Sequence, residues 1–208
     1  MTAFPPFRRV TGVVAPLDRP NVDTDQIIPK QFLKRIERTG YGPYLFYDWR
    51  YAGDGVTEDP DFELNREPWR HAPILLAGRN FGCGSSREHA AWALEDYGVR
   101  VVMAPSFGDI FFTNALKIGL LPVRLPEPVA VRWMDAARED PGLTADVDLE
   151  DGYVVCAGER QPIDVDAAAR ERLLGGLDEV ALTLQRSGDI DAYESQRDSW
   201  LPRTTALT

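Results

Sequence analysis

The middle of the chain alternates between short apolar stretches and stretches of helix-forming residues, and this alternation constrains the fold most. Residues 73–77, 99–104 and 119–125 are apolar runs of strand length, whereas residues 86–97 and 107–117 have the composition of helices. Strands separated by helices of this length typically lie parallel in one sheet, with the helices packed on its faces. The sequence therefore predicts an α/β fold.

The flanking regions extend this prediction to a mixed sheet flanked by helices. An opening strand is expected over 9–15, and short antiparallel strands within 146–155 and 161–164. Residues 41–70 are aromatic but interrupted by glycine and proline, so we expect them to be irregular. Further helical segments are expected in residues 126–140, 166–174 and 177–187, and residues 26–38 are expected to form a short helical or irregular segment.

Length and charge bound the possible functions. The 208 residues are enough for one domain, expected over 1–187, and the polar residues 188–208 lack periodicity and are expected to form a loosely attached tail. Acidic residues outnumber basic ones by 33 to 23, so we expect no nucleic-acid partner. No apolar run approaches the length of a membrane span and no leader is apparent, so we expect a cytoplasmic protein without a membrane partner.

The supply of metal ligands is small. Two cysteines, Cys83 and Cys156, and two histidines, His71 and His89, are too few for the usual zinc or iron–sulfur ligand sets. We expect free thiols, no metal site and no cofactor bound by this chain.

The loop between the predicted strand 73–77 and the next helix has the composition of an anion site. Residues 82–89 read GCGSSREH, which places small residues, two hydroxyls and a guanidinium at a helix start. The first-turn amides of a helix lack partners and favour carboxylates, and arginine adds a two-donor fork. A capping box from Ser85 to Glu88 explains part of the pattern equally well, and the two interpretations are compatible.

Two other patterns fail at this loop. It lacks the G-x-S-x-G spacing of serine hydrolases, and Arg87 stands where the dinucleotide fingerprint needs its third glycine. Cys83 has no histidine at a motif-defined distance, so we do not expect a catalytic thiol.

Two nearby segments carry charge. Asp23 and Asp25 lie in a loop of turn-forming residues, where they either cap the next segment or contribute to a site. A basic segment follows, which is either a solvated face or part of that site; it contains Lys30, Lys34, Arg35 and Arg38.

Several motifs together resemble one family. NFGCGSSREHAA at 80–91, SFGDI at 106–110 and NALKIGLLP at 114–122 resemble the swivelling domain of the aconitase superfamily. NVDTDQIIPKQFL at 21–33 resembles that superfamily's bacterial small subunits, which interconvert 2- and 3-isopropylmalate through 2-isopropylmaleate in leucine biosynthesis. The resemblance covers most of residues 5–200 and implies a swivelling β/β/α domain like the aconitase C-terminal domain.

The resemblance also implies roles for particular residues. Ser85 would act as an alkoxide base, while Ser86 and Arg87, next to Gly84, would hold a substrate carboxylate. Asp25 would position groups or handle a proton. The [4Fe-4S] cluster would belong to a separate large partner subunit, and the substrate would be a small dicarboxylate.

One departure concerns substrate choice. Aconitases place a histidine after the aspartate, whereas Gln26 stands here. The segment that follows would therefore contact the isopropyl group, and its candidate residues are Ile28, Phe32, Leu33, Lys34 and Arg35. Two alternatives stay open: a substrate such as citramalate or homocitrate, and a non-catalytic carboxylate-binding domain.

Overall fold

A computed structural model of the chain describes residues 4–34, 37, 39–85, 87–198 and 200–201. Within these residues seven strands form one sheet in the order β4-β3-β2-β1-β5-β6-β7. The first four strands run parallel, and β5, β6 and β7 continue the sheet antiparallel to their neighbours. The strands are β1 (Arg9–Leu17), β2 (Ile74–Ala77), β3 (Val101–Ala104), β4 (Leu121–Arg124), β5 (Thr144–Asp148), β6 (Tyr153–Cys156) and β7 (Glu159–Pro162).

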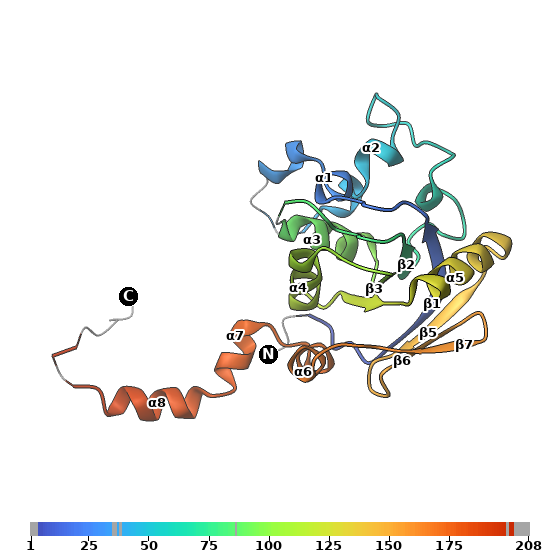
Figure 1. The fold of residues 1–208 in the computed structure, drawn as a ribbon. Coiled ribbons are helices and arrows are strands. Elements are labelled where there is room, and N and C mark those ends of the chain that lie inside the picture. The colour runs from blue at the N-terminus through green and yellow to red at the C-terminus, as the bar shows by residue number, and fades with distance from the viewer. Residues whose placement is uncertain (1–3, 35–36, 38, 86, 199, 202–208) are drawn as a thin grey trace.

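Helices cover both faces of the sheet, as Figure 1 shows. The α-helices are α1 (Thr24–Ile27), α2 (Tyr47–Arg50), α3 (Glu88–Tyr97), α4 (Asp109–Lys117), α5 (Glu127–Glu139), α6 (Ala167–Gly175), α7 (Glu179–Leu184) and α8 (Ser187–Ser195), and short 3-10 turns are η1 (Lys30–Lys34), η2 (Gly42–Tyr44) and η3 (Glu63–Asn65). The predicted mixed α/β fold is confirmed.

Alternating side chains of the strands divide the interior into two cores. Leu75 and Val102 point to the face covered by α1, α3 and α4, where much of the 41–70 region also packs. Leu76 and Met103 point to the opposite face, where α5 and α6 contribute Trp133 and other buried residues. Because the parallel strands are buried on both faces, their sequences are continuously apolar instead of alternating.

Strand β1 changes its hydrogen-bonding partner halfway along. Residues 9–13 pair with β5, and residues 14–17 pair with β2. The carboxyl ends of β1, β2 and β3 consequently meet at one edge of the sheet, and their loops lie side by side.

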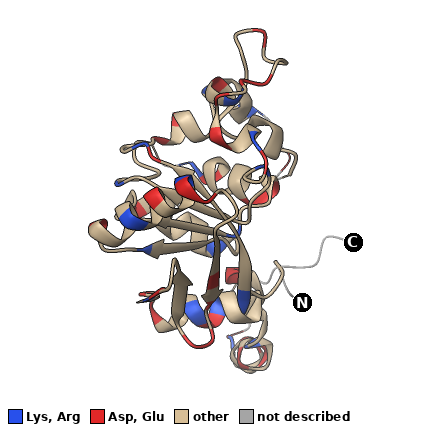
Figure 2. Cartoon of the chain, turned by 90° about the vertical axis from the view of Figure 1, so that its right-hand side faces the viewer, with Lys and Arg blue, Asp and Glu red and all other residues tan. Residues whose placement is uncertain are grey.

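The described part of the segment 26–38, expected to be helical or irregular, contains the end of α1, which begins at Thr24, and the 3-10 turn η1. Another segment differs from the sequence-based expectation. Residues 187–195 form helix α8 although the sequence shows no clear periodicity there. Acidic and basic residues are interspersed on the side of the chain drawn in Figure 2, without a basic stripe there.

Candidate functional site

Three loops at the carboxyl ends of the parallel strands are joined by backbone hydrogen bonds. After β1 and β2, Gly82 N donates to Val22 O at 2.7 Å, and Thr24 N donates to Cys83 O at 2.9 Å. After β3, Gly108 N donates to Phe81 O at 2.9 Å. The start of the motif loop, at residues 81–83, is thus held between its two neighbours, at the sheet edge where α/β folds bind ligands.

Glycine conformation shapes this loop. Gly82 and Gly84 adopt φ values of +72° and +91°, which side chains other than glycine rarely tolerate. A Cβ atom on Gly82 would lie 2.3 Å from the Phe111 ring. The loop therefore needs glycine both for its turn and for the close approach of α4.

Ser85 is exposed at the end of this loop. Its carbonyl oxygen accepts a hydrogen bond from Thr24 Oγ1 at 2.9 Å, so the side chain of Thr24 fixes the backbone next to the hydroxyl. Thr24 is 2 % exposed, and the only feature of the sequence that points to this contact is the position of Thr24 before Asp25 in the T-D pair. Ser86 lies outside the described residues.

Helix α3 begins at Glu88, and Arg87 rather than Ser85 occupies the N-cap position. The side chain of Arg87 makes no capping hydrogen bond. The capping-box interpretation of Ser85 is therefore wrong. The positive end of α3 lies directly after the loop, where an anion is favoured.

Arg87 and Asp25 form an ion pair across the two loops. The Arg87 side chain is 11 % exposed and that of Asp25 is 37 % exposed, and Lys30 Nζ lies 3.8 Å from Asp25 Oδ2. The hydrogen bond from Arg87, aided by the charges of Arg87 and Lys30, lowers the pKa of Asp25 although partial burial opposes this. The guanidinium predicted to bind a substrate carboxylate thus already contacts a carboxylate of the protein.

Asp23 caps a helix. Its side chain accepts from Gln26 N, and the Gln26 side chain accepts from Asp23 N, which completes a capping box at α1. The capping interpretation is thus confirmed for Asp23, whereas Asp25 faces Arg87. The residue that distinguishes this chain from aconitases, Gln26, has a structural role in α1.

The candidate specificity residues differ in accessibility. Ile28 is fully buried, and Phe32 stacks on Tyr44 with ring centroids 4.1 Å apart. Leu33 is half-buried and Lys34 is exposed. Arg35 lies outside the described residues. Among the four described candidates, the side chain of Lys34 faces solvent most openly.

Burial disfavours charge on two other groups near the loop. Burial, with a smaller effect from Asp23, raises the pKa of the Cys83 thiol. Burial also lowers the pKa of His89, whose ring packs against those of Tyr41 and Trp92. Burial therefore disfavours the thiolate, which is the nucleophilic form of Cys83, and the charged form of the His89 imidazole.

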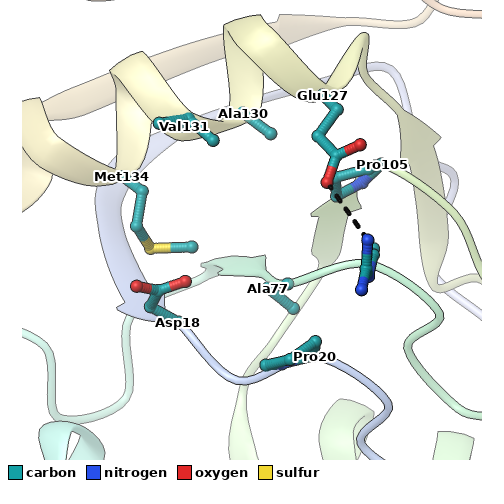
Figure 3. A pocket seen from close by; sticks show the side chains of 10 residues that line it. Asp18, Pro20, Ala77, Pro105, Glu127, Ala130, Val131 and Met134 are labelled. Carbon is teal, nitrogen blue, oxygen red and sulfur yellow. Dashed lines mark ion pairs between the residues drawn. The ribbon is translucent and has the colours of Figure 1, made fainter.

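A separate cavity of about 230 Å³ lies between α5 and the strand ends on the opposite face of the sheet (Figure 3). Its apolar wall includes Ala130, Val131 and Met134. At its rim, Arg79 Nη1 lies 3.9 Å from Glu127 Oε1. None of the described candidate site residues lines this cavity. It is distinct from the Ser85 loop.

The described part of the chain contains no group of three or more His, Cys, Asp or Glu side chains that could hold a metal ion. Within the same residues, no helix has the length and apolar character needed to cross a membrane.

Comparison with known proteins agrees with the fold. Residues 4–128 match the family model of the aconitase C-terminal domain, and residues 179–206 match that of the C-terminal domain of the 3-isopropylmalate dehydratase small subunit. A crystal structure of 3-isopropylmalate dehydratase from Methanocaldococcus jannaschii is similar, with a TM-score of 0.61 and 27% identity over 89% of this chain and 99% of that one.

Curated relatives are similar over nearly their whole length. The 3-isopropylmalate dehydratase small subunit of Bacillus licheniformis is 53% identical over 199 residues, which cover 94% of this chain and 98% of the relative. That of Bacillus subtilis is 51% identical with the same coverage. The chain therefore belongs to the family of 3-isopropylmalate dehydratase small subunits, within the aconitase superfamily.

Proposed function

We propose that this chain is one half of a cytoplasmic hydro-lyase that interconverts 2-isopropylmalate and 3-isopropylmalate through 2-isopropylmaleate. The observation that carries the proposal is the loop 82–87, which places exposed Ser85 and the nearly buried guanidinium of Arg87 at the start of α3. Membership of the 3-isopropylmalate dehydratase small-subunit family supports the substrate.

Substrate binding uses the positive end of α3. One substrate carboxylate replaces Asp25 at Arg87, or shares the guanidinium with it, and Ser86 and the backbone near Gly84 complete the contact. Binding energy is gained because a planar guanidinium matches a carboxylate with two donors. Asp25, itself beside Lys30, then keeps the guanidinium oriented or accepts a hydrogen bond from the substrate.

Ser85 handles the proton. In dehydration, its alkoxide removes the proton from the carbon next to a carboxylate, the carbon–carbon double bond forms, and hydroxide leaves the neighbouring carbon. In rehydration, Ser85 returns a proton to the carbon that carried the hydroxyl, and hydroxide adds to the other. Since an alkoxide is a strong base, the nearby positive end of α3 and the guanidinium of Arg87 must stabilise it in a site closed to water.

The other half of the site belongs to a partner. The name small subunit, shared by the relatives, implies a large partner, which we propose carries a [4Fe-4S] cluster. Bound there, the cluster supplies a Lewis acid for the departing hydroxyl. The described residues of this chain offer no ligand set for it.

The burial of the residues in the candidate specificity segment indicates which of them can contact the substrate. We propose that Lys34 approaches the substrate, with Leu33 at the edge, while Phe32 anchors the segment through Tyr44 and Ile28 anchors it in the core. Arg35, outside the described residues, stays a predicted member of this segment.

The test combines this chain with a cluster-loaded large subunit without oxygen and follows the ultraviolet absorbance of 2-isopropylmaleate formed from 3-isopropylmalate. Turnover is expected only in the mixture. Citramalate and homocitrate are compared under the same conditions, and a higher kcat/KM for either would replace isopropylmalate as the proposed substrate.

Ser85→Ala is expected to lower kcat by about 10²–10⁴-fold, the usual contribution of a positioned base, with partner binding retained. Thr144→Ala, which removes an exposed hydroxyl from β5, is the control and should leave kcat unchanged. Unchanged turnover in Ser85→Ala would refute the base assignment, and a complex inactive on all three substrates would favour the carboxylate-binding alternative.

A further inference from the structure

Helices α7 and α8 extend away from the sheet and its covering helices (Figure 1). We call residues 179–195, which form these helices, the arm. None of its helical residues is buried. Four of its large apolar side chains are open to solvent: Val180 is 64% exposed, Leu184 59%, Ile190 37% and Tyr193 70%.

Helix α8 lacks the packing that usually stabilises so short a helix. It has 9 residues, includes Gly188 in its first turn and buries no side chain. Isolated helices of this length are marginal in water, and most helical stability in proteins comes from an apolar face packed on another surface. The arm therefore has the properties of an element that is completed by a partner.

A cavity of about 210 Å³ lies at the root of the arm, between α3, α4 and α7. Trp92 and Val180 contribute apolar surface, and Asn114 also lines the cavity. Asn114 is 8% exposed, and its Nδ2 has no hydrogen-bond acceptor among the described residues. A buried amide without a partner is unfavourable, so Asn114 would gain a hydrogen bond if docking shifted the cavity wall and brought an acceptor to Nδ2.

The root cavity and the candidate site meet at the first turn of α3. Glu88, which also lines it, directly follows Arg87 at the start of α3. A subunit that covers the Ser85 loop and the first turn of α3 would therefore contact one wall of the root cavity.

Charge indicates the chemistry of the occupant. Around the cavity and along the arm, carboxylate side chains outnumber the two cations, Lys117 and Arg186. Lys117 Nζ already lies 3.1 Å from Glu179 Oε1. A second copy of this chain, with a net charge of −10, would be repelled. The carboxylates are Glu88, Asp178, Glu179, Asp189, Asp191 and Glu194.

We propose that the arm and its root cavity form a docking surface for the large subunit, which presents apolar side chains, basic residues and an acceptor for Asn114. This inference rests on the proposed function. The family matches support it, because the model of the small subunit's C-terminal domain covers residues 179–206, separately from the aconitase domain at residues 4–128.

The test measures the Kd between the full-length chain and the cluster-loaded large subunit by titration calorimetry without oxygen. Replacing two arm residues, Leu184→Ala with Tyr193→Ala, should raise the Kd at least about tenfold, as expected for apolar interface anchors. Val56→Ala with Val131→Ala is the matched control, since both valines are exposed away from the arm and should leave the Kd unchanged.

Two further variants test the charge and the amide. Asp189→Lys with Asp191→Lys should weaken binding and reduce its sensitivity to salt, whereas Asp135→Lys with Glu139→Lys on α5 should not. Asn114→Leu should weaken binding while the Tm of the free chain is retained or raised, because the unpaired donor is removed.

The outcomes separate this inference from the proposed function. If the wild-type chains form an active complex and the arm variants bind as tightly as wild type, the docking surface is refuted. If wild-type chains neither associate nor turn over isopropylmalate, the proposed function itself fails. Sedimentation of the chain alone as a dimer that the arm variants dissociate would assign the surface to a second copy instead.

Discussion

Asp25 and Arg87 hold each other in the free chain, and this pair links stability to pH. The pKa of Asp25 is lowered by the hydrogen bond from Arg87, so the pair stabilises the fold above the ordinary carboxyl pKa. This contribution is lost as the pH falls through the lowered pKa of Asp25. Because Asp25 is partly exposed, solvent screening keeps the contribution near or below about 1 kcal/mol.

Asp25→Asn is therefore expected to be less stable than wild type at neutral pH, with the difference shrinking below about pH 4. Urea unfolding of both proteins between about pH 3 and about pH 8 measures this across the range in which the carboxyl titrates. Asp61→Asn, at an exposed carboxylate, is the control. A difference that grows on acidification would contradict the assigned pair.

Arg87→Lys tests carboxylate recognition at the same position. Lysine keeps the charge but loses the planar fork, so KM should rise at least about tenfold with partner binding retained. Arg79→Lys, at the rim of the cavity on the other face, should leave KM unchanged. Equal KM values for wild type and Arg87→Lys would show that the guanidinium does not bind the substrate.

At the scale of the elements, the site depends on how closely two loops approach. A Cβ atom on Gly108 would lie 2.4 Å from Gly82 O, although the backbone of Gly108 itself suits any residue. Gly108→Ala should therefore destabilise the fold by about 1–3 kcal/mol through overpacking and displace the Ser85 loop.

Gly53→Ala is the matched control for Gly108→Ala, because nothing lies within 4 Å of its added methyl group. Urea unfolding should show it as neutral or slightly stabilised, since alanine restricts the unfolded chain. Equal stability of both variants would mean that the loops can separate at little cost.

Local sequence predicts the elements better than the contacts between them. The apolar runs that form β2, β3 and β4 are evident because glycine and proline bound them. Helix α8 is not evident, because its apolar residues are few and its acidic residues many. Sequence periodicity reveals a helix through the apolar face that the helix buries, and α8 buries no such face.

The members of the candidate site can be named from the sequence, but their pairing cannot. Ser85, Arg87 and Asp25 are all identified by motif, yet the ion pair joins residues 62 positions apart. The hydrogen bond from Thr24 to Ser85 spans 61 positions, and nothing in either local segment specifies it. Such contacts depend on the parallel arrangement of β1 and β2, which brings the two loops together.

For the whole molecule, two cores on opposite faces of one sheet must form together. Trp133 is fully buried on α5, and its Nε1 donates to Glu159 Oε2 at 3.1 Å. Trp133→Ala should lower the free energy of unfolding by about 3–5 kcal/mol, because it leaves a cavity in the core. Because residues 1–187 are predicted to form a single domain, we expect the unfolding transition of this variant to remain cooperative.

Far-UV circular dichroism in urea, together with tyrosine fluorescence, checks this loss. Coincident midpoints, both shifted downward relative to wild type, are expected. Val131→Ala on the exposed side of α5 provides the comparison. Two separate transitions in Trp133→Ala would instead show that the two faces unfold as independent units.

The exchange of partners along β1 has a consequence for engineering. Because residues 9–13 pair only with β5 and residues 14–17 only with β2, the backbone pairing that joins the antiparallel ribbon to the parallel strands runs through β1 alone. The tight turns after β5 and β6, at Gly152 and Gly158, lie on this ribbon. A peptide tag or fluorescent label inserted at these turns should therefore report on assembly while the strand ends that carry Ser85 and Arg87 keep their positions.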